Sequence, residues 1–360
     1  MALDLERLRK EIDRIDSRLL ELLTERMKIV ERIAELKREA ELPIVDPIRR
    51  SALLSKAERY AKEKEVSSEA LRAIYESVIK ASENYQRYLG SAAFLGPRGT
   101  YSMEAATKFF GEKIQLVSLS SIKEIFELVV AKEVKYGVVP IENSLEGSYG
   151  LVMDYLFEHD VKICGEVILK ISHVLAGNQS TSLSNIRVVM SHPQAIAQCR
   201  RFLSALKDIE VREVGSTAEA ASEASHKAGV AAICSRYAAD LYNLRILAEN
   251  IADYPANFTR FLVISNSDAP PSGLDKTSII FSVRHIPGAL YLALKPFAER
   301  RINLTKIESR PVRHRPWEYL FYVDLEGHRT EDNVADALKE LKEITITLKL
   351  LGSYPRASNP

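Results

Sequence analysis

Cysteine is rare in this chain of 360 residues: only Cys164, Cys199 and Cys234 occur, and they lie far apart. This spacing excludes a disulfide framework and a cysteine metal knuckle, and it predicts a reduced, cytoplasmic protein. No apolar run approaches the roughly 20 residues that span a bilayer. The N-terminal "MALDLERLRKEID" lacks the apolar core of a signal peptide, so we expect no membrane association.

The chain also lacks an excess of charge of either sign. Lys and Arg number 50 against 49 Asp and Glu, a formal net charge of +1. Nucleic acids and anionic membranes usually select a basic excess, so we expect neither as a partner. A hydrophobic content of 46% and a charged content of 28% describe a globular protein. The length predicts two or three domains.

Glycine is absent before Gly90, and proline occurs there only at positions 43 and 47. This stretch should therefore be helical, with helices over about 3–40, 48–62 and 67–88. The first helix carries apolar residues at alternating spacings of three and four from Leu5 to Leu36, a seam typical of coiled coils. Such a long helix cannot bury its seam within its own small domain. We expect a second chain to cover it.

Arg26 occupies a position in this seam where an apolar residue is expected. A buried arginine is costly unless it meets an anion, so Arg26 indicates a ligand-binding interior. The other candidates in this region are Arg9, Lys37, Asp46, Arg49, Ser82 and Gln86. Several cations directed inward would suit a small dicarboxylate, because arginine binds carboxylates bidentately. The alternative is that most of these charges lie on a solvated surface.

The segments "LRKEIDRIDSRLLELLTER", "PIVDPIRR" and "SENYQ" resemble the all-helical chorismate mutases over residues 1–90. The resemblance implies an all-α three-helix domain in an intertwined dimer, with Arg9 donated to the partner's site. It implies that Arg26, Lys37 and Arg49 hold the carboxylates and the ether oxygen, while Asp46, Ser82 and Gln86 supply polar contacts. The pericyclic rearrangement to prephenate needs a compact conformer and cationic stabilisation, with no cofactor.

One residue departs from the pattern of the mutase family. Arg50 stands where the family has a glutamate that contacts the substrate hydroxyl. Losing a charged hydrogen-bond partner costs roughly 1.5–3 kcal/mol. We therefore predict an impaired or altered mutase in which Arg50 is a pocket residue.

Residues 92–158 and 186–242 each alternate strand and helix three times, which predicts two lobes with parallel sheets. Apolar segments at 163–175 and 258–265 are expected to cross between the lobes. Ligands bind beyond the strand ends of such sheets, so the cleft between the lobes is the expected site.

Five motifs lie in this region: "GPRGTYS" (96–102), "PIENS" (140–144), "SHPQA" (191–195), "GSTAEAA" (215–221) and "NFTRF" (257–261). Where they open helices, their N–H groups and hydroxyls can bind an anion. Singly, Ser102, Ser191 and Thr217 would be helix N-caps and His192 a cap or packing residue. The candidate binding residues are Thr100, Ser102, Glu142, Asn143, Ser144, Ser191, His192, Thr217, Asn257 and Phe261.

Together the five motifs resemble prephenate dehydratase over residues 91–270, a two-lobed α/β domain similar to periplasmic binding proteins. The resemblance implies that Thr259 hydrogen-bonds the leaving hydroxyl and that Arg260, with the helix N-termini, holds the side-chain carboxylate of prephenate. Glu142 and His192 are candidate proton sources. Phe261 is expected to pack.

Residues 276–355 follow the order strand, helix, strand, strand, helix, strand, which is the ferredoxin-like pattern. "PGAL" (287–290) and "ESRP" (308–311) resemble the phenylalanine-binding motifs of an ACT regulatory domain. The implied effector residues are Gly288, Ala289, Leu290, Glu308, Ser309, Arg310 and Pro311. Without the resemblance, these motifs would indicate a turn and a salt bridge at a strand end.

The whole sequence thus resembles the bifunctional chorismate mutase–prephenate dehydratases regulated by phenylalanine. This implies chorismate and prephenate as substrates, phenylalanine as effector, a dimer or tetramer, and no cofactor or metal. Two alternatives stay open. One is a prephenate or arogenate dehydratase whose mutase-like domain serves dimerisation or regulation. The other is a non-catalytic amino-acid sensor.

Overall fold

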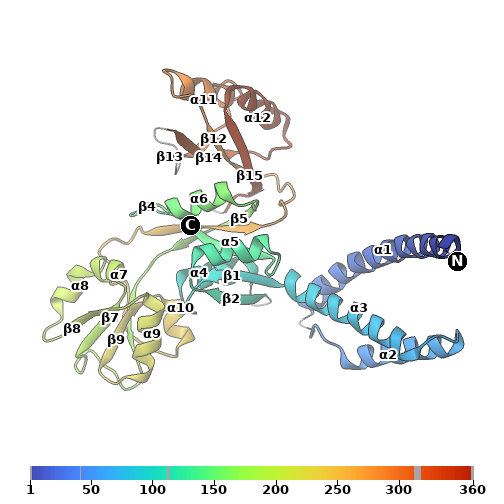
Figure 1. Ribbon diagram of the computed structural model, residues 1–360. Helices are drawn as coiled ribbons and strands as arrows, with labels where there is room; N and C mark the ends of the chain where they lie inside the picture. The colour runs from blue at the N-terminus through green and yellow to red at the C-terminus, as the bar shows by residue number, and fades with distance from the viewer. Residues whose placement is uncertain (1, 41, 112–113, 312–317, 358–360) are drawn as a thin grey trace. The chain divides into compact units, whose positions relative to one another are not determined.

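The structure is a computed structural model and describes residues 2–40, 42–111, 114–311 and 318–357. The chain forms two compact units (Figure 1). The first contains residues 2–91 together with 114–115, and the second contains residues 92–111 and the described residues from 116 onward. The first unit is helical. The second contains all the sheets that are described below. None of the helices in the described ranges is long and apolar enough to cross a membrane.

The first unit consists of α1 (Ala2–Glu39), α2 (Pro47–Glu63) and α3 (Ser68–Leu89). Asp46 begins α2, because its carboxylate accepts a hydrogen bond of 2.9 Å from the Arg49 N–H. Pro47 occupies the first helical position, where the missing N–H is not needed. Ser67 caps α3 through a 3.2 Å bond from the Ala70 N–H. The three expected helices are therefore present.

Helix α1 leaves its apolar seam largely uncovered within one chain. Leu8, Ile12, Ile15 and Leu22 are each more than half exposed, and Leu36 near the other end is 63% exposed. An apolar stripe of this length is unusual on the surface of a soluble monomer.

The second unit begins with two lobes, each built around one sheet. The first sheet has the order β2-β1-β3-β11-β5, and β4 pairs with β3. Its strands are β1 (Ser91–Leu95), β2 (Gln115–Leu119), β3 (Tyr136–Asn143), β4 (Gly147–Ser148), β5 (Lys162–Lys170) and β11 (Phe258–Ser265). Its helices are α4 (Tyr101–Phe110), α5 (Ile122–Val130) and α6 (Gly150–Glu158).

The second sheet has the order β10-β6-β9-β7-β8. Its strands are β6 (Val174–Gly177), β7 (Val188–Ser191), β8 (Glu210–Glu213), β9 (Val230–Cys234) and β10 (Arg245–Ala248). Its helices are α7 (Pro193–Ala197), α8 (Arg200–Ala205), α9 (Thr217–His226) and α10 (Arg236–Leu241). The chain enters this lobe after β5 and returns to the first lobe through β11, as the apolar segments indicated.

The sheets are mixed, so the expectation of parallel sheets was wrong in part. Strand β11 runs antiparallel to both β3 and β5, and β6 runs antiparallel to β9. The parallel pairs that are resolved, such as β1 with β3, involve the strands that alternate with helices. The crossing strands enter from the other lobe without a crossover helix, and a parallel neighbour requires such a connection.

The C-terminal part is a four-stranded antiparallel sheet in the order β13-β14-β12-β15. The strands are β12 (Asp275–Ser282), β13 (Leu304–Pro311), β14 (Tyr319–Glu326) and β15 (Thr347–Pro355), with helices α11 (Ala289–Glu299) and α12 (Asp332–Ile344). This strand order is that of a ferredoxin-like βαββαβ fold, as predicted.

The C-terminal sheet packs directly against the first lobe. Ile280, Tyr322 and Tyr354 of the C-terminal sheet share one hydrophobic core with Ile163 and Leu262 of the first lobe. At Gly352 the two backbones approach so closely that an added Cβ would lie 2.2 Å from the Ile163 carbonyl oxygen. Only glycine fits there. The lobe and the C-terminal domain are thus joined through packed, buried surface.

Candidate functional sites

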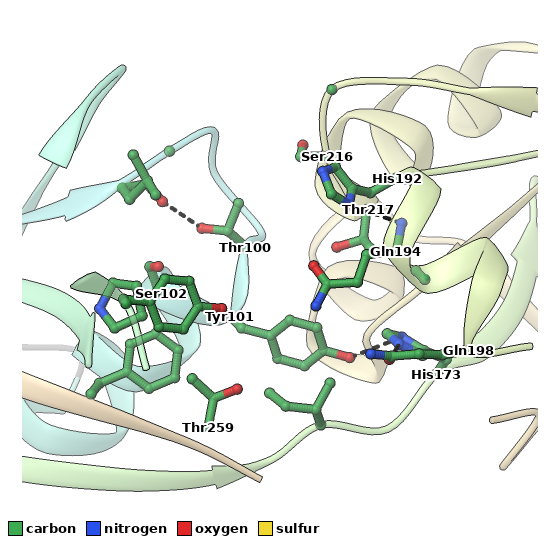
Figure 2. A pocket seen from close by; sticks show the side chains of 18 residues that line it. Thr100, Tyr101, Ser102, His173, His192, Gln194, Gln198, Ser216, Thr217 and Thr259 are labelled. Carbon is green, nitrogen blue, oxygen red and sulfur yellow. Dashed lines mark hydrogen bonds between the residues drawn. The ribbon is translucent and has the colours of Figure 1, made fainter. Parts of the chain in front are cut away.

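A cavity of about 270 Å³ lies between the two lobes of the second unit (Figure 2). Figure 2 shows Thr100, Ser102 and Thr259 of the first lobe facing Ser216, Thr217 and His192 of the second. Its lining includes Thr100, Tyr101, Ser102, Tyr149, His173, His192, Gln194, Gln198, Ser216, Thr217, Thr259 and Phe261. The cleft between the lobes is therefore a cavity, and residues of all five sequence motifs line it, with Pro140 as the contribution of "PIENS".

Two ten-residue helices begin at this cavity. Thr100 caps α4 through the Met103 N–H at 3.4 Å, and Ser216 caps α9 through the Glu219 N–H at 2.9 Å. The expected caps Ser102 and Thr217 lie one or two residues inside their helices and still line the cavity. Helix N-termini favour anions, so the cavity suits a carboxylate.

Ser191 and His192 were both candidates for a helix cap and for ligand binding, and the structure gives them different places. Ser191 is fully buried and donates to the Ile233 carbonyl at 2.6 Å, so it holds the sheet and does not line the cavity. His192 caps the short helix α7, where its Nδ1 accepts a 3.3 Å bond from the Gln194 N–H, and its ring lines the cavity. The sequence Ser191-His192 did not indicate which of the two side chains would cap helix α7.

Thr259 is oriented by a chain of amide side chains. Asn143 donates from Nδ2 to Thr259 Oγ1 at 2.9 Å and to Asn257 Oδ1 at 2.7 Å. Asn257 in turn donates to Gln198 Oε1 at 3.2 Å. Because Thr259 accepts from Asn143, its own hydroxyl proton is left to point into the cavity. The chain of amides therefore makes Thr259 a hydrogen-bond donor toward a bound molecule.

The amide chain ends at residues that sequence reasoning missed. His173 lies 3.1 Å from Gln198 Oε1, and Tyr101 donates to the Ser172 carbonyl at 2.7 Å beside the same histidine. Burial lowers the pKa of His173, so the ring is neutral and donates from Nε2 to Gln198. Tyr101 stands inside the motif "GPRGTYS" and could have been found there, whereas His173 is isolated in the sequence.

Arg260 points away from the cavity, and this corrects the role expected for it. Successive side chains of a strand face opposite sides of the sheet. Thr259 and Phe261 line the cavity, so Arg260 between them faces the C-terminal domain. Its guanidinium donates to Glu166 at 2.6 Å, Asp324 at 2.5 Å, Glu142 at 3.1 Å and the Tyr354 hydroxyl at 2.9 Å. It cannot hold a ligand in the cavity from that position.

These contacts form a buried ion cluster that joins the first lobe to the C-terminal domain. Lys276 and Lys306 complete it, with Lys276 at 3.0 Å from Glu166 and Lys306 at 2.6 Å from Glu142. The three cations Arg260, Lys276 and Lys306 thus face three carboxylates. Burial lowers the pKa of Arg260, but Asp324, two tyrosines and Glu166 raise it well above its usual value.

Glu142 belongs to this cluster and not to the cavity lining. Burial raises its pKa, but hydrogen bonds and charge from Lys306 and Arg260 outweigh burial and lower the pKa below the usual value. An ionised, paired carboxylate is a poor proton donor, so the geometry disfavours Glu142 as the proton source. Ser144 also lies off the cavity lining, where its hydroxyl accepts the Phe258 N–H at 2.9 Å.

The motif "ESRP" contacts the first lobe through alternate residues. Glu308 accepts from the Ser148 hydroxyl at 3.1 Å, and Arg310 donates to Asp154 at 3.0 and 3.1 Å. Ser309 and Pro311 are exposed. Gly288 precedes α11 with a φ of 81°, a left-handed conformation that favours glycine. Ala289 is buried, and Leu290 packs against the hydrophobic core of this domain.

The helical unit has a cavity of its own of about 490 Å³. Seven predicted residues line it: Arg26, Lys37, Asp46, Arg49, Arg50, Ser82 and Gln86. Arg26 hydrogen-bonds Ser82, and Lys37 donates to the Ile44 carbonyl at 2.7 Å. Oε1 of Gln86 is buried and has no partner among the described residues. Arg9 lies elsewhere on α1 and does not line the cavity of its own chain.

Among the described residues, no group of three or more histidines, cysteines, aspartates or glutamates could hold a metal ion. The three cysteines are unpaired. Burial raises the pKa of each thiol to about 12, so none is an activated nucleophile.

Three parts of the chain match known protein families. Residues 8–87 match chorismate mutase type II, residues 92–269 match prephenate dehydratase, and residues 277–343 match the ACT domain.

Relatives cover the chain wholly or in part. A protein of Aquifex aeolicus (strain VF5), named bifunctional chorismate mutase/prephenate dehydratase, is 47% identical and covers 98% of both chains. The solved structure of a prephenate dehydratase from Arthrobacter aurescens in complex with L-Phe is 34% identical, with a TM-score of 0.67. It covers 74% of this chain and 90% of that one. A structure described as GqqA, a novel type of quorum quenching acylase, is 31% identical, with a TM-score of 0.68. It covers 74% of this chain and 98% of that one.

The orientation of Thr259 can be tested with Asn143→Asp. An aspartate keeps the two bonds that Asn143 Oδ1 accepts from the Leu145 and Glu146 N–H groups, but it cannot donate to Thr259. The Thr259 hydroxyl would then donate to the new carboxylate. We expect the turnover number for dehydration of prephenate, the activity that the resemblance implies, to fall roughly a hundredfold or more, with KM little changed. Wild-type turnover in this variant would contradict the orientation.

Proposed function

Because the chain belongs to the family of bifunctional chorismate mutase/prephenate dehydratases, we propose that it rearranges chorismate to prephenate and converts prephenate to phenylpyruvate, under feedback inhibition by phenylalanine. The observation that supports a second activity, besides that of the second unit, is the cation-lined cavity of the helical unit. The fold of the second unit alone does not show which reaction the protein catalyses, because one fold hosts several activities. The single-activity alternative finds no support in the full-length match.

In the helical cavity, the proposed chemistry is positioning and charge stabilisation. Arg26, Lys37 and Arg49 would bind the two carboxylates of chorismate and the ether oxygen, on which negative charge develops as the C–O bond breaks. Gln86 lines the same cavity, and its amide can donate to that oxygen. Prepared donors in a dry cavity lower the barrier of a pericyclic reaction without a nucleophile or an acid.

In the cavity between lobes, the ring hydroxyl of prephenate must leave as water while the ring carboxylate leaves as carbon dioxide. The electron pair of the breaking C–C bond enters the ring, and the C–O bond breaks with transfer of a proton to the leaving oxygen. Thr259 is held as a donor and would supply this hydrogen bond. The N-termini of α4 and α9, in place of Arg260, would bind the side-chain carboxylate.

The helical unit is proposed to work as part of a dimer or tetramer. The uncovered seam of α1 needs a partner surface, and a second copy offers the same seam. Arg9 is too far along α1 to line its own cavity, so it would complete the cavity of the partner. Each mutase site would then be built from two chains.

Feedback inhibition is proposed to pass through the contacts between β13 and the first lobe. Lys306 bridges Glu142 and the Ser148 hydroxyl, while Glu308 accepts from the same hydroxyl. Glu142 directly precedes Asn143, which orients Thr259. A shift of β13 on binding phenylalanine would therefore reach the catalytic threonine through one strand, provided that phenylalanine binds the two states with different affinity.

An assay that starts from chorismate tests the two proposed activities together. The full chain should release phenylpyruvate from chorismate, and phenylalanine should slow the conversion of prephenate. Turnover of prephenate without turnover of chorismate would overturn the two-activity proposal. Turnover of neither substrate would overturn both.

The shared mutase site can be tested by mixing two inactive variants. Arg9→Ala and Arg26→Ala should each lose mutase activity, because each site would lack one cation. In co-expressed mixtures, half of the dimers are mixed and each has one intact site, so about a quarter of the wild-type activity should return. Mixtures that stay inactive, in assemblies shown by mass to be mixed, would contradict a site built from two chains.

A further inference from the structure

The helical cavity contains one carboxylate that sequence reasoning did not single out. Glu83 on α3 lines the cavity beside Ser82 and Gln86, and the residue is only 8% exposed. The other acid in the lining, Asp46, is committed to capping α2. Burying a carboxylate is costly unless it is paired, so the position of Glu83 calls for partners.

Arg50 is the partner that the structure shows. Its Nη1 lies 3.4 Å from Glu83 Oε2, and its Nη2 lies 3.1 Å from Glu76 Oε1. The guanidinium is thus drawn from α2 toward α3 and is shared by two carboxylates. The charge of Arg50 is therefore neutralised at the wall of the cavity and does not add to the unpaired cations inside.

The second oxygen of Glu83 is available. Among the described residues, hydrogen bonds to Glu83 reach only Oε2, from Arg50. Oε1 has no such bond and is not fully enclosed, and Glu83 lines the cavity, so this oxygen can accept a hydrogen bond from a bound molecule. An ionised carboxylate oxygen accepts hydrogen bonds about twice as strong as those of a neutral acceptor.

Chorismate, the substrate of the proposed function on which this inference rests, carries two carboxylates and one ring hydroxyl. The cations of the cavity match the carboxylates, but the hydroxyl needs an acceptor. We propose that Glu83 binds this hydroxyl and that Arg50 holds Glu83 in position. Compared with the family pattern, the carboxylate that binds the hydroxyl would then come from α3 and not from α2. Arg50 on α2 would hold this carboxylate, so it would not impair the mutase in the way that the sequence suggested.

The experiment compares Glu83→Gln with Glu76→Gln in the full chain. Both variants remove one carboxylate from Arg50, but Glu76 is half exposed and does not line the cavity. We expect Glu83→Gln to lower mutase kcat/KM about 10- to 100-fold and Glu76→Gln to change it by less than about twofold. Unchanged dehydratase activity in both variants would show that the chain is folded.

A substrate analogue whose ring hydroxyl is replaced by hydrogen shows whether Glu83 contacts this hydroxyl or only maintains the shape of the cavity. If Glu83 binds the hydroxyl, wild type and Glu83→Gln should rearrange the analogue at rates that differ far less than for chorismate. An equal loss with both substrates, or no loss with either, would overturn the inference. A wild-type chain without mutase activity would instead overturn the proposed function, so the two failures are distinguishable.

Discussion

The ion cluster around Arg260 is the interaction on which the second unit depends. Arg260 is only 6% exposed, and its guanidinium joins the sheet of the first lobe to Asp324 in the sheet of the C-terminal domain. Three cations against three carboxylates make the cluster neutral, but removing one partner would leave a buried charge at a cost of about 3–5 kcal/mol. The cluster also fixes strand β11, whose other face carries Thr259. The threonine that we propose to be catalytic and an interdomain ion pair are thus neighbours on one strand, because a strand has two faces.

The helical unit differs from the second unit, because several of its residues are placed for contacts that one chain alone does not make. The seam of α1 is exposed, Arg9 is remote from its own cavity, and Gln86 Oε1 has no partner among the described residues. These features fit together if a second chain covers the seam and a dicarboxylate fills the cavity. Arg50 and Glu83 show how such a cavity can tolerate a reversed charge, because a carboxylate on the facing helix neutralises it.

Much of this architecture was predictable from local patterns. The absence of glycine before Gly90 and the alternation of strands and helices gave the helical domain and the two lobes. Arg260 shows where motif reasoning fails: it stands beside Thr259 in "NFTRF", yet strand alternation sends it to the opposite face. That alternation was readable, but the acidic partners, Glu166 and Asp324, are distant in sequence and became visible only in the fold. His173 had no local signal.

In the proposed regulation, Lys306 and Glu142 couple β13 to β3, whose Asn143 orients Thr259. Lys306→Met removes this bridge and leaves the bonds of Arg260 intact, and Arg300→Met removes an ion pair with Glu340 inside the C-terminal domain as a control. The measurement is dehydratase rate against phenylalanine concentration. We expect Lys306→Met to keep its uninhibited rate within about twofold but to need roughly tenfold more phenylalanine for half inhibition, while Arg300→Met should respond as wild type. An unchanged phenylalanine response in Lys306→Met would contradict coupling through Lys306 and Glu142.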